Sequence, residues 1–87
     1  MQNRNRMTDS AKIKNWVASM VGKNRYELQA VDYCGLQDGR TLCADVYDDF
    51  LLFSIEGEGG NPLAVLIDRL TAGNVPSIAA TIQNTFK

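Results

Sequence analysis

The two cysteines are the residues of this chain best suited to chemistry, because the sequence contains no histidine. Thiols can cross-link, bind metals or act as nucleophiles, but a structural zinc site needs about four cysteine or histidine ligands. A nucleophilic triad that uses a histidine base is likewise excluded within one chain. We therefore expect no catalytic residue, no metal site, no cofactor and no enzymatic activity.

The cysteines flank Asp38-Gly39, the dipeptide most typical of a two-residue β-hairpin turn. Such a turn places Cys34 opposite Cys43 as a non-hydrogen-bonded pair. Their Cα atoms would then lie about 4.5 Å apart, at the short end of the disulfide range. This register predicts a candidate redox pair. We favour two half-buried thiols that pack as small hydrophobic groups. They would stay reduced in the cytoplasm, since no secretory signal is evident.

Three strands are expected to position these residues, near 25–34, 41–47 and 50–56. A second tight turn at Asp48-Asp49 joins the last two strands. Alternation with a period of two then gathers an apolar row on one face of the sheet. The members of this predicted row are Val31, Tyr33, Leu42, Ala44, Val46, Leu51, Phe53 and Ile55.

The opposite face of the predicted sheet is not cleanly polar, although a solvated face should be. We interpret it as a partner-binding surface with apolar anchors and an acidic rim. In this register Asp32 lies opposite Asp45, an unfavourable pairing of like charges. The predicted binding residues are Tyr26, Leu28, Tyr47, Phe50, Leu52, Asp32 and Asp45.

Helical spacing of apolar residues predicts three helices, near 9–21, 62–72 and 76–86. Thr8 or Ser10 can cap the first helix, and Gly22 can end it. Asn61-Pro62 is typical of a helix start. The expected molecule is an α+β protein in which a helix, a three-stranded antiparallel meander and two helices follow in order, with the helices packed on the sheet. Residues 1–8 are expected to be a disordered lead, and residues 9–87 a single domain.

The charge of the chain is small overall but uneven. Its 87 residues carry a net charge of −1 and are 45% hydrophobic. Residues 1–25 hold most of the basic side chains with Asp9 as their sole acid, whereas the rest of the chain is acidic. No apolar run approaches the roughly 18 residues of a membrane span. We therefore expect a small cytoplasmic protein that has no membrane partner.

The favoured function is a small protein-interaction module that binds itself, as a homodimer, or a basic partner surface through one sheet face. The alternative is weak nucleic-acid binding, since the order of helix, three strands and helix is also that of double-stranded RNA-binding domains. Lys12 and Lys14, with Arg4 and Arg6, would then contact phosphates. Those domains need a basic cluster where the helix after the third strand begins. Asn61-Pro62-Leu63-Ala64 offers none, which makes a nucleic-acid partner the weaker hypothesis.

Overall fold

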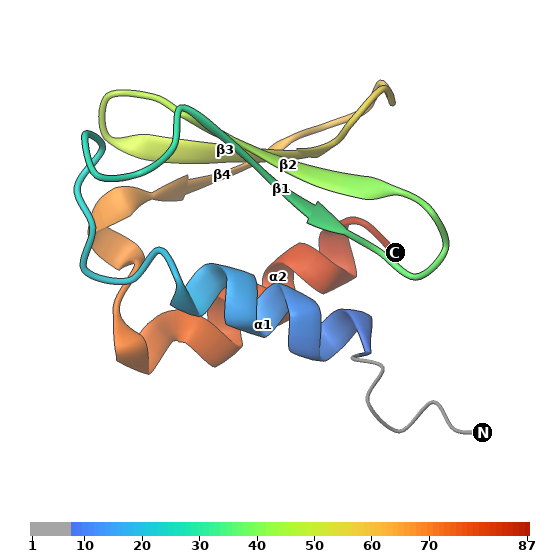
Figure 1. Cartoon of the computed structure of the whole chain (residues 1–87), viewed down its shortest axis with the longest axis horizontal. Helices are drawn as coiled ribbons and strands as arrows, with labels where there is room; N and C mark the ends of the chain where they lie inside the picture. The colour runs from blue at the N-terminus through green and yellow to red at the C-terminus, as the bar shows by residue number, and fades with distance from the viewer. Residues whose placement is uncertain (1–7) are drawn as a thin grey trace.

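A four-stranded antiparallel sheet with two helices on one face forms the α+β fold (Figure 1). The structure is a computed structural model that describes residues 8–87. The strands lie in the order β1-β2-β3-β4, so each pairs with its neighbour in the sequence. The elements are α1 (Asp9–Ala18), β1 (Val31–Gly35), β2 (Thr41–Val46), β3 (Phe50–Ile55), β4 (Leu63–Leu66), two 3-10 helices, η1 (Ile67–Arg69) and η2 (Ala72–Asn74), and α2 (Val75–Thr85).

The first helix begins where its cap predicts. The Thr8 hydroxyl accepts a hydrogen bond from the Ala11 backbone N–H at 3.2 Å, which satisfies one of the free donors of the first turn. The α-helix ends at Ala18, and hydrogen-bonded turns continue to Gly22, whose φ is +77°. The rest of the expected lead, residues 1–7 with Arg4 and Arg6, lies outside the described residues.

The hairpin of β2 and β3 has the predicted register. Ala44 pairs with Phe53 and Val46 pairs with Leu51. The backbone N–H of Tyr47 donates to the Phe50 carbonyl at 2.9 Å and closes a two-residue turn. All four paired side chains are wholly or partly buried among core residues, so this pair of strands presents one apolar face to the helices.

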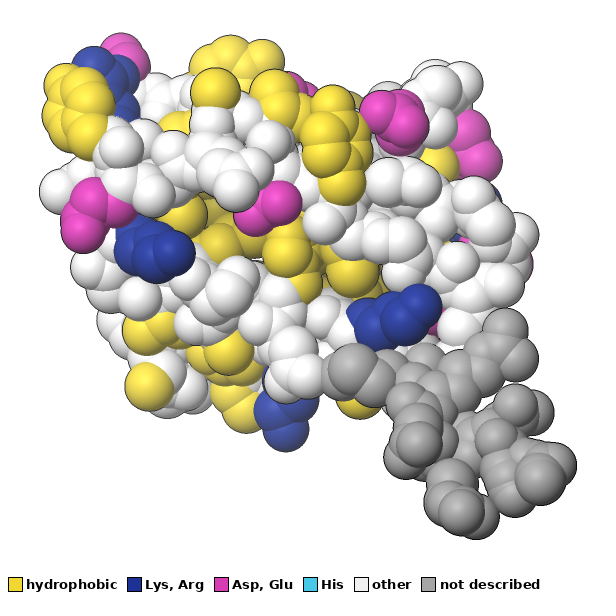
Figure 2. All heavy atoms as spheres, viewed as in Figure 1, with side chains coloured by type: hydrophobic (Ala, Val, Ile, Leu, Met, Phe, Trp, Pro, Cys, Tyr) yellow, Lys and Arg dark blue, Asp and Glu magenta, His cyan; other side chains and the backbone are white. Residues whose placement is uncertain are grey.

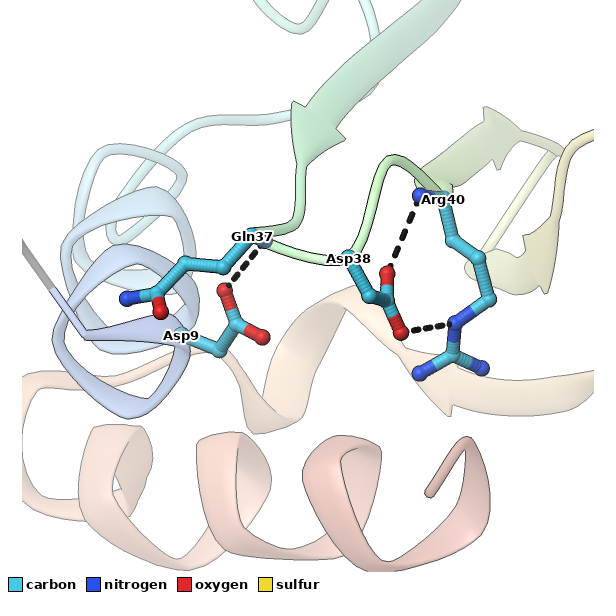
Figure 3. Close-up of polar contacts among 4 residues, drawn as sticks. All are labelled: Asp9, Gln37, Asp38 and Arg40. Carbon is cyan, nitrogen blue, oxygen red and sulfur yellow. Dashed lines mark hydrogen bonds and ion pairs between the residues drawn. The ribbon is translucent and has the colours of Figure 1, made fainter.

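The hairpin of β1 and β2 differs from the prediction by one residue. Three residues, not two, form its loop, because the Leu36 N–H donates to the Arg40 carbonyl at 2.8 Å. Gly39 takes a left-handed φ of +92°, as in three-residue loops that end in a bulge. Asp38 accepts from the Arg40 backbone at 3.0 Å and from its Nε at 2.8 Å, and Asp9 accepts from the Gln37 N–H at 2.8 Å (Figure 3). These bonds tie the loop to itself and to α1.

A shift of one residue moves every side chain of β1 to the other face of the sheet. Cys34 pairs with Leu42 and is buried in the core, whereas Tyr33 pairs with Cys43 and is 52% exposed. The predictions that Cys34 faces Cys43 and that Val31 and Tyr33 join the apolar row are therefore wrong. Asp32 and Asp45 are not opposed either, because they pair with Ala44 and Val31.

The helix expected at 62–72 is also wrong, because residues 63–66 form β4 instead. This strand pairs with the second edge of β3, and its Val65 lies opposite Leu51. The apolar run at 63–67 suits a helix or a strand, and so short a segment takes the structure that its neighbours favour. Within this segment Leu70 is buried in the core, but Leu66 is 50% exposed.

Both helices lie side by side beneath the sheet (Figure 1). Trp16 of α1 meets Phe53 of β3 edge to face, with ring centroids 5.5 Å apart. From α2, Ile78, Ala79 and Ile82 complete this layer. With two helices on one face, the described chain has no third helix to cover the other.

Candidate partner-binding surface

The outer sheet face is the side of the sheet that points away from both helices (Figure 1). Every second residue of each strand contributes to it, because side chains alternate along a strand. Its members, from β1 to β4, are Val31, Tyr33, Thr41, Cys43, Asp45, Phe50, Leu52, Ser54, Ala64 and Leu66.

This face is largely apolar and open. The exposed fractions of Val31, Tyr33 and Leu66 are 36%, 52% and 50%. In the space-filling view, hydrophobic side chains gather along the strand side of the molecule, with acidic side chains among them (Figure 2). No element of residues 8–87 covers this surface. Contiguous apolar surfaces of this kind mark interaction sites more often than chance exposure does.

An aromatic hollow of about 530 Å³ lies at one end of this face, beside the turn between β2 and β3. Tyr47 and Phe50 flank that turn and stack with ring centroids 4.9 Å apart. The segment between α1 and β1 forms the facing wall with Tyr26 and Leu28. Rigid aromatic side chains of this kind bury a large area at a low entropic cost.

Arg25 connects the two walls of the hollow. Its guanidinium pairs with Asp48 of the turn, donates to the Tyr26 hydroxyl at 2.8 Å and lies 4.6 Å from the centroid of the Tyr26 ring. The hydrogen bond to Tyr26 is the largest cause that raises the pKa of Arg25. The charges of Tyr26 and Asp48 act in the same direction. The pair is solvent-exposed, so it orients the wall and adds little stability.

The predicted binding residues fall into three groups. Phe50, Leu52 and Asp45 lie on the outer sheet face, and Tyr47 adjoins it. Tyr26 and Leu28 are not in a strand, but they line the aromatic hollow. Asp32 is misplaced, because it pairs with the buried Ala44 and therefore belongs to the helix side of β1.

Sequence reasoning assigned four members of this surface to other parts of the fold. A two-residue loop in the first hairpin places Val31 and Tyr33 in the core, and a helix at 62–72 removes Ala64 and Leu66 from the sheet. The Asp-Gly pair allows a three-residue loop as well as a two-residue loop. A three-residue loop at Asp38-Gly39 would have placed Val31 and Tyr33 on the outer sheet face.

The thiols of the two cysteines occupy different environments. Cys34 is 8% exposed within the core, and burial raises its pKa, with Lys12 acting in the opposite direction. Cys43 is half-buried on the outer face, where burial, Asp45 and Glu56 raise its pKa. Both thiols are thus poor nucleophiles at neutral pH.

Other chemistry has little support in residues 8–87. They contain no group of three or more histidine, cysteine, aspartate or glutamate residues that could hold a metal ion. None of their helices has the length and apolar character needed to cross a membrane. Comparison of the chain with protein-family models, curated proteins and solved structures gave no significant match. The outer sheet face and the aromatic hollow are therefore the features of residues 8–87 that bear on function.

Proposed function

We propose that this chain is a small, non-enzymatic protein-interaction module that binds through its outer sheet face. The observation that carries the proposal is the open apolar face of a sheet whose other face already holds both helices. The partner is a second copy or a protein with a basic and apolar surface. A binding role also fits the absence of histidine and the raised pKa values of both thiols.

The arrangement of side chains supports a protein partner. Aromatic residues near the centre of a contact supply most of its energy, and polar residues surround them. Here Tyr33, Tyr47 and Phe50 supply the aromatic area, and Asp45, Asp48 and Asp49 lie beside it. An acidic rim accelerates encounter with a basic surface and disfavours an acidic one.

The basic residues expected to bind nucleic acid do not extend this surface. Lys12 donates from its Nζ to the Gly35 carbonyl at 3.4 Å, and Lys14 lies beside a separate hollow next to α2. Arg4 and Arg6 lie outside the described residues. Nucleic-acid binding therefore stays the weaker alternative, and a steep loss of affinity with salt would identify it.

The double variant Phe50→Asp with Leu52→Lys tests the proposal. Both side chains are only half-buried, so we expect the variant to fold, with unchanged circular dichroism. We also expect it to lose a partner that wild type captures from its native host and binds again after purification. If self-association is the function, the variant instead loses the concentration-dependent rise in solution mass.

A matched control carries the same two charges on exposed positions of α1, as Asn15→Asp with Ala18→Lys. It should bind as wild type does. A folded outer-face variant that keeps every wild-type partner and the wild-type solution mass would contradict the proposal.

A further inference from the structure

The free edge of β4 carries backbone groups without partners in the sheet. The Ile67 N–H donates to the Asp49 carbonyl at 2.9 Å, which makes these two residues a bonded pair of the antiparallel ladder. Bonded pairs alternate along such a ladder, so Val65 and Leu63 bond to β3. The N–H and C=O groups of Ala64 and the N–H of Leu66 therefore point outward, away from the sheet, whereas the Leu66 carbonyl begins η1.

The two edges of the sheet are protected differently. At the β1 edge, Asp32 adds a charge and the ammonium of Lys12 lies 3.4 Å from the Gly35 carbonyl. The sequence of β4, Leu-Ala-Val-Leu, has neither a charge nor a proline. Proteins usually guard exposed edges with such residues, and an unguarded edge is a template for another strand.

A groove of about 320 Å³ runs beside this edge, between β4 and α2. Leu63, Val65 and Ile78 form its apolar wall, and Arg69 lies in its lining. The outer side of α2 is also without charge, and the hydroxyl of Thr81 donates to the Ser77 carbonyl of its own helix at 2.9 Å. The groove therefore offers apolar contact directly beneath any strand that pairs with β4.

We infer that β4 pairs with β4 of a second copy of this chain, antiparallel about a two-fold axis at Val65. This operation sets Ala64 against Leu66 of the second copy, so that the outward Leu66 N–H of each copy meets the outward Ala64 carbonyl of the other. The product is one eight-stranded sheet, an instance of strand addition between identical edges. Val65 of each copy then approaches its equivalent above the groove.

Charge favours a second copy as the occupant. No charged side chain of either β4 meets a like charge, because the strand has none. Glu56 and Glu58 precede β4, and Arg69 follows it. Antiparallel pairing brings the Arg69 end of one copy toward the acidic end of the other, and Arg69 is the one charged residue among the described residues in the lining of the groove. This contact is separate from the outer sheet face, which stays open in the dimer and becomes twice as wide.

Leu66→Pro is the decisive variant. Leu66 already has a φ of −62° and a ψ of 138°, which a proline adopts without strain. Its N–H points outward, so proline removes a donor for the second copy and leaves the β3–β4 ladder intact. We expect wild type to show a doubled mass in sedimentation or light scattering, and Leu66→Pro to be a folded monomer.

Two further measurements distinguish the loss of the Leu66 N–H from the loss of its side chain. Leu66→Ala keeps the N–H and removes the same side chain, so it should remain dimeric. In wild type, amide exchange at Ala64 and Leu66 should slow as protein concentration rises. The inference is overturned if wild type stays monomeric at its highest soluble concentration, or if folded Leu66→Pro keeps the doubled mass. A doubled mass that only the outer-face variant abolishes would assign self-association to the outer sheet face instead.

Discussion

Single residues at the first hairpin decide which side chains are available for chemistry. The three-residue loop separates Cys34 from Cys43 by placing one on each face of the sheet. Adjacent strands bring their side chains together only on a shared face. The register thus removes the geometric basis for the candidate redox pair and leaves two independent thiols.

We predict that diamide forms no intramolecular disulfide in the native protein. Iodoacetamide should modify Cys43 and leave Cys34 unlabelled until the protein unfolds, because Cys34 is 8% exposed. Since burial raises the pKa of the Cys43 thiol, its labelling should be slow at neutral pH and should still be accelerating above about pH 8.5, the ordinary thiol value. Mass spectrometry measures both, with Cys43→Ser as the control. Rapid formation of a Cys34–Cys43 bond would refute the register.

Gly39 is the residue on which the loop conformation depends. Its φ of +92° costs any side chain roughly 1–2 kcal/mol. We therefore predict that Gly39→Ala lowers the free energy of unfolding by about that amount. Gly59 has an ordinary φ and open space around it, so Gly59→Ala should be neutral or stabilise the protein by up to about 1 kcal/mol. Equal effects of the two substitutions in denaturant titrations would contradict this account of the turn.

At the scale of elements, β3 organises the fold. Its inward side chains, Leu51, Phe53 and Ile55, are at most 7% exposed. They meet α1 through Trp16, and the strand pairs on both sides with β2 and β4. A central strand with partners on both edges and helices on one face concentrates the apolar contacts of a small domain.

We predict that Phe53→Ala lowers the free energy of unfolding by about 3–5 kcal/mol, the usual cost of deleting a fully buried phenylalanine. Phe53 is 0% exposed, and a domain of this size has only about 5–15 kcal/mol in total. The melting temperature of the variant should therefore lie clearly below that of wild type. Leu52→Ala, on the outer face of the same strand, is the control and should cost clearly less. Comparable losses in thermal melts would mean that the faces of β3 are misassigned.

At the scale of the whole molecule, the fold separates three surfaces. The helices close one face of the sheet, the outer sheet face stays open, and the edge of β4 offers backbone groups. The open face and the free edge lie on different sides of the same strands, so one chain can use both at once. A dimer through β4 would present a wider outer face to a further partner.

We predict that the two surfaces act independently. The outer-face variant, Phe50→Asp with Leu52→Lys, should keep the dimer while it loses a heterologous partner. Leu66→Pro should lose the dimer and bind that partner as Leu66→Ala does, because both variants lack the same outer-face side chain, with weaker avidity if the partner is itself multivalent. Sedimentation with and without the purified partner separates these results. Loss of both properties in a folded Leu66→Pro variant, with both kept in Leu66→Ala, would show that they depend on one surface.

Local signals in the sequence are enough to predict several parts of this protein. Thr8 and Gly22 mark the bounds of the first helical region, and the alternating residues of 41–55 specify one hairpin in its correct register. The composition, with no histidine, had already limited the chemistry. The helix bounds and the hairpin register depend on residues that are close together in the sequence, so they can be predicted without the fold.

Contacts between distant segments, in contrast, fixed the face of β1, the identity of residues 63–66 and the place of α1. One residue in a loop reverses a whole strand, and both loop lengths suit Asp38-Gly39. The run at Leu63–Leu66 became a strand because β3 still had an unpaired edge, which a helix could not satisfy. That choice left two helices for one face of the sheet. The open face and the free edge thus result from pairing between distant segments. Local sequence patterns do not predict such pairing.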